Sequence, residues 1–186
     1  MTSLKLFPKQ VVAVGIIFAL GGLGTMGAGI YINNFVSDEL AAQNITTPED
    51  ASMPNVPVNS IASALSMADI IQHHAADSSK GLTYAQMGRF AVEDGNPAGT
   101  NDAKAAKLDA NGKPVSNAAR TTQLTASGLV TSLSLSAMAI GAAYGAIALG
   151  LGFLVLGIVV IGLGYALLGL ITPEVAKRFG LHPVTA

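Results

Sequence analysis

The sequence predicts an all-α membrane protein, in which two transmembrane helices form a hairpin and enclose a small, mostly helical and loop-rich extracytoplasmic segment. Two observations support this prediction. The 186 residues are 51% hydrophobic and only 11% charged, whereas a soluble domain carries about 25% charged residues. No charge lies between Lys9 and Asp38, or between Arg120 and Glu174. Both stretches exceed the roughly 20 apolar residues that a helix needs to cross a bilayer.

The distribution of charge predicts the orientation. Lys5 and Lys9 precede the first apolar stretch, and Lys177 and Arg178 follow the second, whereas the region between holds ten acidic and six basic residues. Loops rich in Lys and Arg remain on the cytoplasmic side of a membrane. We therefore expect a membrane protein with both termini in the cytoplasm and the middle region outside.

Six parts follow from this assignment. They are a cytoplasmic N-terminus (1–10), a first transmembrane helix (11–36), an extracytoplasmic segment (37–120), the amphipathic stem of a second helix (121–143), its transmembrane part (144–172) and a cytoplasmic tail (173–186). The first apolar stretch exceeds the 7 to 15 or so residues in the core of a cleaved signal peptide, which favours a retained anchor. The absence of cysteine excludes disulfides and a lipidated cysteine.

The second apolar stretch is predicted as one long helix rather than two spans. Two spans would carry the basic tail outside, and a turn near Gly150 would have no polar residue to meet water. The beginning of the stretch, TTQLTASGLVTSLSLS, contains eight Ser or Thr residues in sixteen, which favours an amphipathic stem outside the membrane. The large apolar residues near one face of this stem are Leu124, Leu129, Leu133 and Ile140.

The extracytoplasmic segment combines loops with short helices. The proline-rich stretch ITTPEDASMPNVPVNS is expected to be extended or looped. Asn59 or Ser60 can cap a helix that continues to about Ala76, and a second short turn begins at Thr83. The apolar positions of the helix capped by Asn59 or Ser60 are Ile61, Leu65, Ala68 and Ile71. The polar region 93–119, with a tight turn at Asn111-Gly112, is expected to be mobile or ordered by a partner. Because its apolar core is thin, we expect the segment to lean on the stem or on another subunit.

The stretch GGLGTMGAG contains the spacing G-x-G-x-x-G, which in a strand–turn–helix unit binds a dinucleotide. Here the apolar character continues through the glycines, and a proline-rich loop follows, so we prefer a membrane interpretation. Small residues four apart make a groove that lets helices approach closely in lipid. The predicted helix-packing residues are Gly21, Thr25 and Gly29 in the first helix, and Gly141, Gly145, Ala142, Ala146 and Gly150 in the second. We expect these faces to pack on the spans of partner subunits or against lipid.

Outside the membrane, Asp69, His73, His74 and Asp77 form the one concentration of candidate metal ligands. Asp69 and His73 are four residues apart and could share a metal ion or a hydrogen bond. Adjacent histidines, however, point about 100° apart on a helix, so His73 and His74 cannot easily serve one ion. The alternative is a set of solvated polar residues at a helix end, and no metal or other cofactor is expected.

Four stretches together resemble a family of small two-span actinobacterial membrane proteins, which are often labelled aromatic ring-opening dioxygenases. They are MADIIQHHA, GLTYAQM, AARTTQLTASGLVTSL and the Gly-rich second span. The label conflicts with the chemistry of this chain, because such enzymes hold Fe(II) between two His and a carboxylate on one face. The resemblance instead implies an accessory subunit of the actinobacterial respiratory supercomplex.

Neither apolar stretch contains Asp, Glu, Lys, Arg or His, which argues against a proton relay or a haem ligand at membrane depth. The leading hypothesis is therefore a non-catalytic accessory subunit of a larger plasma-membrane complex, with no nucleic-acid or small-molecule substrate. Two alternatives remain open. One is an extracytoplasmic metal-binding or sensing module built on Asp69 and His73, and the other is a homo-oligomer with a channel lined by Ser and Thr.

Overall fold

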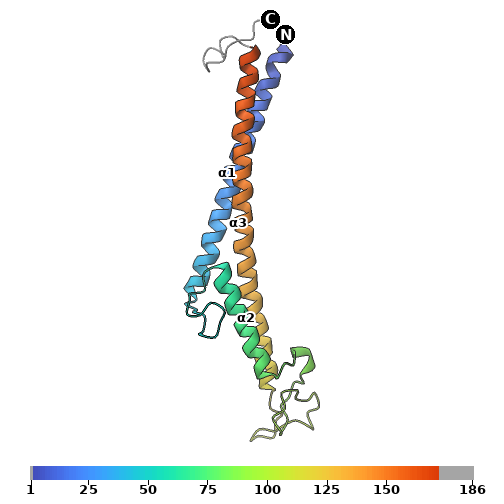
Figure 1. Ribbon diagram of the computed structural model, residues 1–186. Helices are drawn as coiled ribbons and strands as arrows, with labels where there is room; N and C mark the ends of the chain where they lie inside the picture. The colour runs from blue at the N-terminus through green and yellow to red at the C-terminus, as the bar shows by residue number, and fades with distance from the viewer. Residues whose placement is uncertain (1, 172–186) are drawn as a thin grey trace. The chain divides into compact units, whose positions relative to one another are not determined.

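The computed structural model describes residues 2–171, and within them the chain is all-helical, without a β-strand (Figure 1). The helices are α1 (Thr2–Ala42), α2 (Ile61–Ser78), the short 3₁₀ helix η1 (Tyr84–Gln86) and α3 (Ala118–Ile171). Thr172 and the predicted cytoplasmic tail, 173–186, lie outside the described residues. The all-helical prediction is confirmed for the part of the chain that the structure describes.

Two helices are long and apolar enough to cross a membrane, as predicted: Leu6–Ala42 within α1 and Ala118–Leu170 within α3. α1 begins earlier and ends later than the predicted span 11–36, because the helix continues into its charged flanks. α3 runs without interruption through Gly150, and its stem and apolar part are one helix of 54 residues. No polar turn interrupts α3 near Gly150, where two separate spans would have required one.

The chain divides into two compact units, which we describe separately. The first contains residues up to Asn34 and those from Gly141 onward. In it, α1 and α3 lie side by side and run in opposite directions (Figure 1). The second unit contains residues 35–140, which include α2, η1, the loops and the adjoining ends of α1 and α3.

The core of the second unit lies where α2 packs against the beginning of α3 and the last turns of α1. Its buried members are Leu40, Val58, Ala64, Ala68, Leu133, Ala137 and Ile140. The expectation that the outer segment leans on the stem of the second helix agrees with this core. In the predicted apolar face of the stem, Leu133 and Ile140 are buried, but Leu124 and Leu129 are about half exposed. The prediction failed for these two because the buried face is centred on smaller residues, Ala126 and Ala137, which permit close approach.

α2 begins where the sequence predicts. Ser60 is the N-cap, and its side chain accepts a hydrogen bond from the backbone N–H of Ser63, while the Ser63 hydroxyl oxygen accepts from the N–H of Ser60. This reciprocal pair satisfies two donors that the helix start would otherwise leave without partners. The buried face of α2 again consists mostly of small residues: Ser63, Ala64, Ser66, Ala68, Ile70 and Ala75. Leu65, predicted on this face, is half exposed.

The proline-rich loop between α1 and α2 is compact. Thr47 is buried, its backbone pairs with Val56, and its hydroxyl donates to the carbonyl of Met53 and accepts from the N–H of Val56. Ser66 on α2 accepts hydrogen bonds from the N–H of Met53 and the hydroxyl of Ser52, each at 2.9 Å. These bonds fasten the loop to α2 and place Val58 in the core.

The polar region before α3 forms a network of turns and isolated bridges. Phe90 bridges to both Thr100 and Ser116, and Leu108 bridges to Pro114 around the predicted turn at Gly112, whose φ is +74°. At the centre lies the buried side chain of Asn117, which donates to the carbonyls of Gly88 and Pro97. The region that we expected to be mobile or ordered by a partner therefore has a hydrogen-bond network of its own.

Candidate functional site

The first candidate site is the glycine seam, which we define as the contact between α1 and α3 in the first unit. Three glycines of α1, Gly15, Gly22 and Gly29, are spaced by seven residues. Three glycines of α3 have the same spacing: Gly150, Gly157 and Gly164. All six are buried. Because the two helices run in opposite directions, moving seven residues toward the C-terminus of α1 corresponds to moving seven residues toward the N-terminus of α3.

The two backbones approach closely at the seam. A Cβ atom on Gly22 would lie 2.5 Å from the carbonyl oxygen of Gly150, and a Cβ on Gly157 would lie 2.6 Å from that of Gly15. At the ends of the seam, Gly29 faces the backbone of Ala143, and Gly164 faces the backbone of Pro8 and Val12. Since real Cβ atoms do not approach other atoms this closely, the seam requires glycine at its centre.

Each glycine also lies against a second residue of the facing helix. This second residue comes four positions after the residue that the glycine directly opposes. Gly150 is covered by Met26, Gly157 by Ala19 and Gly22 by Leu154. The same arrangement recurs at Gly29, which is covered by Ile147. The contacting atoms of Met26, Ala19 and Leu154 are backbone atoms, so this is close backbone packing with the seven-residue period of an antiparallel coiled coil. It allows extensive dispersion contact, which is the main source of helix association where lipid removes the hydrophobic drive.

The predicted small-residue grooves coincide with the seam only in part. Gly29 and Gly150 lie in it, but Gly21 and Gly145 face open space. Gly141 is exposed, Ala142 is exposed and Ala146 is half-buried. The Thr25 hydroxyl donates to the carbonyl of Gly21 within the same helix. The four-residue spacing therefore identified two of the seam's glycines, Gly29 and Gly150. It missed the other four, Gly15, Gly22, Gly157 and Gly164. The seven-residue repeats of glycine in the two apolar stretches could have revealed them.

The seam also limits what the first unit can contain. Where the backbones meet at Gly22–Gly150 and Gly15–Gly157, there is no room for a side chain between them. In the second unit, two hydroxyl-bearing residues of the stem, Ser132 and Ser136, donate to carbonyls four residues earlier in their own helix. Such internal bonds satisfy these hydroxyls without a polar partner outside the helix.

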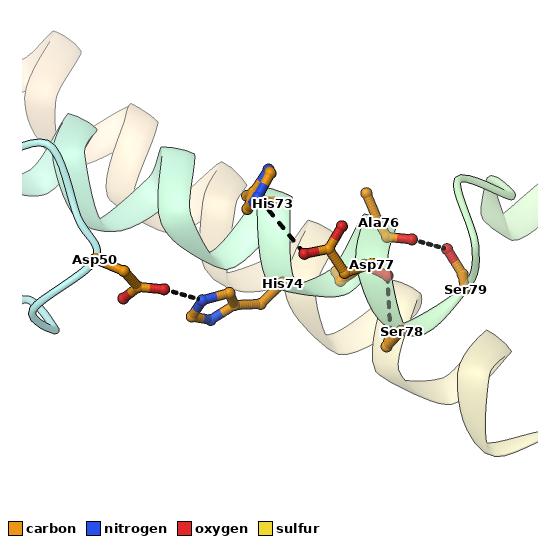
Figure 2. Close-up of polar contacts among 8 residues, drawn as sticks. Asp50, His73, His74, Ala76, Asp77, Ser78 and Ser79 are labelled. Carbon is orange, nitrogen blue, oxygen red and sulfur yellow. Dashed lines mark hydrogen bonds and ion pairs between the residues drawn. The ribbon is translucent and has the colours of Figure 1, made fainter.

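The second candidate site is the histidine pair on α2 (Figure 2). The Nε2 atom of His73 lies 3.5 Å from a carboxylate oxygen of Asp77, one turn later on α2. The Nε2 atom of His74 lies 2.6 Å from a carboxylate oxygen of Asp50, in the proline-rich loop. The neighbouring rings thus have different acidic partners, and Figure 2 shows them on different sides of the helix.

The structure does not bring Asp69 and His73 into contact, because the imidazole of His73 is directed toward Asp77 instead. Among residues 2–171, no three His, Cys, Asp or Glu side chains lie close enough together to hold a metal ion. Asp50 was absent from the predicted cluster because it lies 24 residues before His74, and only the folded loop joins them.

The contact between Asp50 and His74 has an electrostatic consequence. The hydrogen bond from His74 holds the pKa of the Asp50 carboxyl below its ordinary value of 3.8. Both side chains are more than half exposed, so water screens the pair and its contribution to stability is small. The pair joins the proline-rich loop to α2 at the surface.

A shallow groove of about 380 Å³ lies beside His74, between α2 and the first turns of α3. Its walls are mainly apolar or hydroxyl-bearing, and they include Ile71, Thr122, Thr125 and Leu129. His74 is the one titratable residue that lines it.

No family model, no curated protein and no solved structure matches this chain.

Proposed function

We propose that this chain is a non-catalytic accessory subunit of a larger complex in the bacterial plasma membrane. In this proposal α1 and α3 form a transmembrane hairpin, the termini are cytoplasmic, and residues 37–120 lie on the extracytoplasmic side. The family that the sequence resembles implies the actinobacterial respiratory supercomplex as the complex concerned.

The glycine seam is the observation that carries the proposal. In a membrane subunit that transports a solute or transfers electrons, the space between the helices holds polar groups, water or a cofactor. The space between α1 and α3 is instead occupied by direct backbone contact at Gly22–Gly150 and Gly15–Gly157. A pair of helices closed in this way supports anchoring and packing roles over transport or redox roles.

The outward faces of the pair supply the surface for a partner. Large apolar side chains that are at least half exposed occur on both helices, including Ile17, Leu20, Leu149 and Leu163. Gly21 and Gly24 follow Ile17 and Leu20 along α1, and a Cβ atom on either glycine would meet open space. The occupant that we propose for this open surface of α1 is a transmembrane helix of a partner subunit, because lipid-facing positions gain nothing from missing side chains whereas helix contacts do.

The test is affinity purification of the tagged, full-length chain from native membranes in a mild detergent, followed by mass spectrometry. A reproducible set of integral membrane subunits in near-stoichiometric amounts is the expected result. The matched variant is Gly21→Leu, which adds a side chain on the open surface of α1 without touching the seam. A wild-type protein that purifies alone, under conditions that preserve known complexes of the same membrane, would refute the proposal.

A further inference from the structure

A hollow of about 280 Å³ lies in the second unit, where η1, the segment after it and the first turn of α3 meet. We call it the arginine hollow, because two of its walls are Arg89 and Arg120. The other residues used below are Tyr84, Phe90, Ser116 and Thr121, which also line it. The hollow is separate from the glycine seam and from the histidine pair.

Both arginines are oriented by aromatic rings. The guanidinium carbon of Arg120 lies 4.0 Å from the centroid of the Tyr84 ring, and that of Arg89 lies 5.5 Å from the centroid of Phe90. A guanidinium that stacks on a ring keeps its N–H groups in its own plane and available to an acceptor. The stacking therefore presents donors while restricting the flexible arginine side chains.

No anion compensates these charges in the part of the chain that the structure describes. The ion pairs there join His73 to Asp77 and His74 to Asp50, and neither arginine forms one. No Asp or Glu lines the hollow. The Nε atom of Arg120 is also buried without an acceptor among the described residues, although buried N–H groups are ordinarily paired.

We propose that the arginine hollow binds a phosphate-type oxyanion. Two guanidinium groups match the double negative charge of a phosphate monoester, whereas a single carboxylate would neutralise only one of them. Guanidinium and phosphate also form paired, charge-assisted hydrogen bonds. Ser116 adds a hydroxyl to the same walls, while the hydroxyl of Thr121 already donates to the carbonyl of Asn117. The positive end of α3 begins beside the hollow and adds to its field.

The ligand can have two sources, a free phosphate compound or the head group of a phospholipid. Isothermal titration of the full-length protein in a non-ionic detergent, in phosphate-free buffer of constant ionic strength, distinguishes them. One arm uses inorganic phosphate, and the other uses a short-chain phosphatidic acid. Saturable binding in either arm supports the oxyanion site, and the arm that binds more tightly identifies the source.

The variants are Arg89→Gln and Arg120→Gln, with Lys104→Gln as the control that removes one positive charge outside the hollow. We expect each arginine variant to weaken binding by about tenfold or more, as loss of a charge-assisted hydrogen bond does, and the control to bind like the wild type. Arg120→Lys keeps the charge but loses the planar fork, and it should also bind more weakly than the wild type.

Three results would overturn the proposal: no saturable binding in either arm, equal weakening in the Lys104 variant, or acetate binding as tightly as phosphate. Circular dichroism and thermal unfolding verify that each variant is folded. If Arg120→Gln unfolds because it loses its contact with Tyr84, Arg89→Gln decides the question, since Arg89 is an exposed side chain.

Discussion

Gly22 of α1 and Gly150 of α3 oppose each other so closely that a Cβ atom on either one would lie within 2.6 Å of the other's carbonyl oxygen. The contact is between two backbones, which cannot move aside as a flexible side chain can. Seven residues away in each helix, Gly15 and Gly157 repeat the arrangement. The glycine seam is thus an internal feature of this chain, and it need not involve a second protein.

Substitution at the centre of the seam should destabilise the helix pair. Gly22→Ala places a methyl group against the backbone of Gly150 and Leu154, so the helices must separate or shift. We expect a loss of about 1 to 3 kcal/mol, as is typical of overpacking, measured by denaturant titration in detergent. Gly24→Ala, on the open side of the same helix, is the control and should unfold like the wild type. Equal stability of the two variants would contradict the seam.

Gly21 and Gly29, which share one predicted groove, should respond differently to leucine. Gly29→Leu clashes with the backbone of Ala143 and should reduce the stability of the isolated protein. Gly21→Leu meets open space, so the isolated protein should be unaffected, while retention of partner subunits in affinity purification should fall. Unchanged co-purification of Gly21→Leu would show that this side of α1 faces lipid.

Acid should loosen the proline-rich loop through Asp50. Its pKa is lowered in the folded protein, chiefly by the hydrogen bond with His74, so folding favours the ionised form. The resulting stabilisation is fully present above the ordinary value of 3.8 and is lost as the pH falls through the lowered pKa. NMR titration of the loop amides near Asp50 should show this step below pH 3.8. Asp50→Asn should abolish it, and a step that persists in the variant would have to come from another group.

Asn117 should be the most sensitive polar residue before α3. Its buried amide donates to the carbonyls of Gly88 and Pro97 at 3.1 and 2.9 Å, and its oxygen accepts from the N–H of Arg120. Asn117→Ala leaves these groups without partners, which should cost about 1 to 3 kcal/mol and speed amide exchange of residues 88–100. Asn111→Ala, at an exposed turn, is the matched control. Equal exchange in both variants would exclude a central role for Asn117.

The elements that could be predicted are those with local causes. The two long helices follow from the absence of charge over long stretches, and the start of α2 follows from Ser60, one of the two residues predicted to cap it. The turn at Gly112 follows from the Asn-Gly pair before it. Predictions failed where large side chains were used to locate a buried face, as at Leu124 and Leu129, because the closest helix contacts are made by the smallest residues.

The candidate sites depend more strongly on the folded chain. His74 was predicted as a candidate ligand, but its partner Asp50 comes from a loop whose path is set by Thr47 and Ser66. Arg89 and Arg120 are 31 positions apart in the sequence, and nothing in their local pattern indicates a common hollow. Contacts between distant segments are decided by loop geometry, which the local periodicity of a sequence does not contain.

By itself, the sequence determined that this chain has two long helices, each with a long charge-free stretch, and a polar segment between them, because hydrophobicity and charge are properties of each residue. Only the tertiary structure decided which glycines meet: Gly15, Gly22 and Gly29 face α3, whereas Gly21 faces away from it. The physical reason is that neighbouring helical residues differ in direction by about 100°. The choice of contact face therefore depends on the register between two helices, which forms only when their backbones come together.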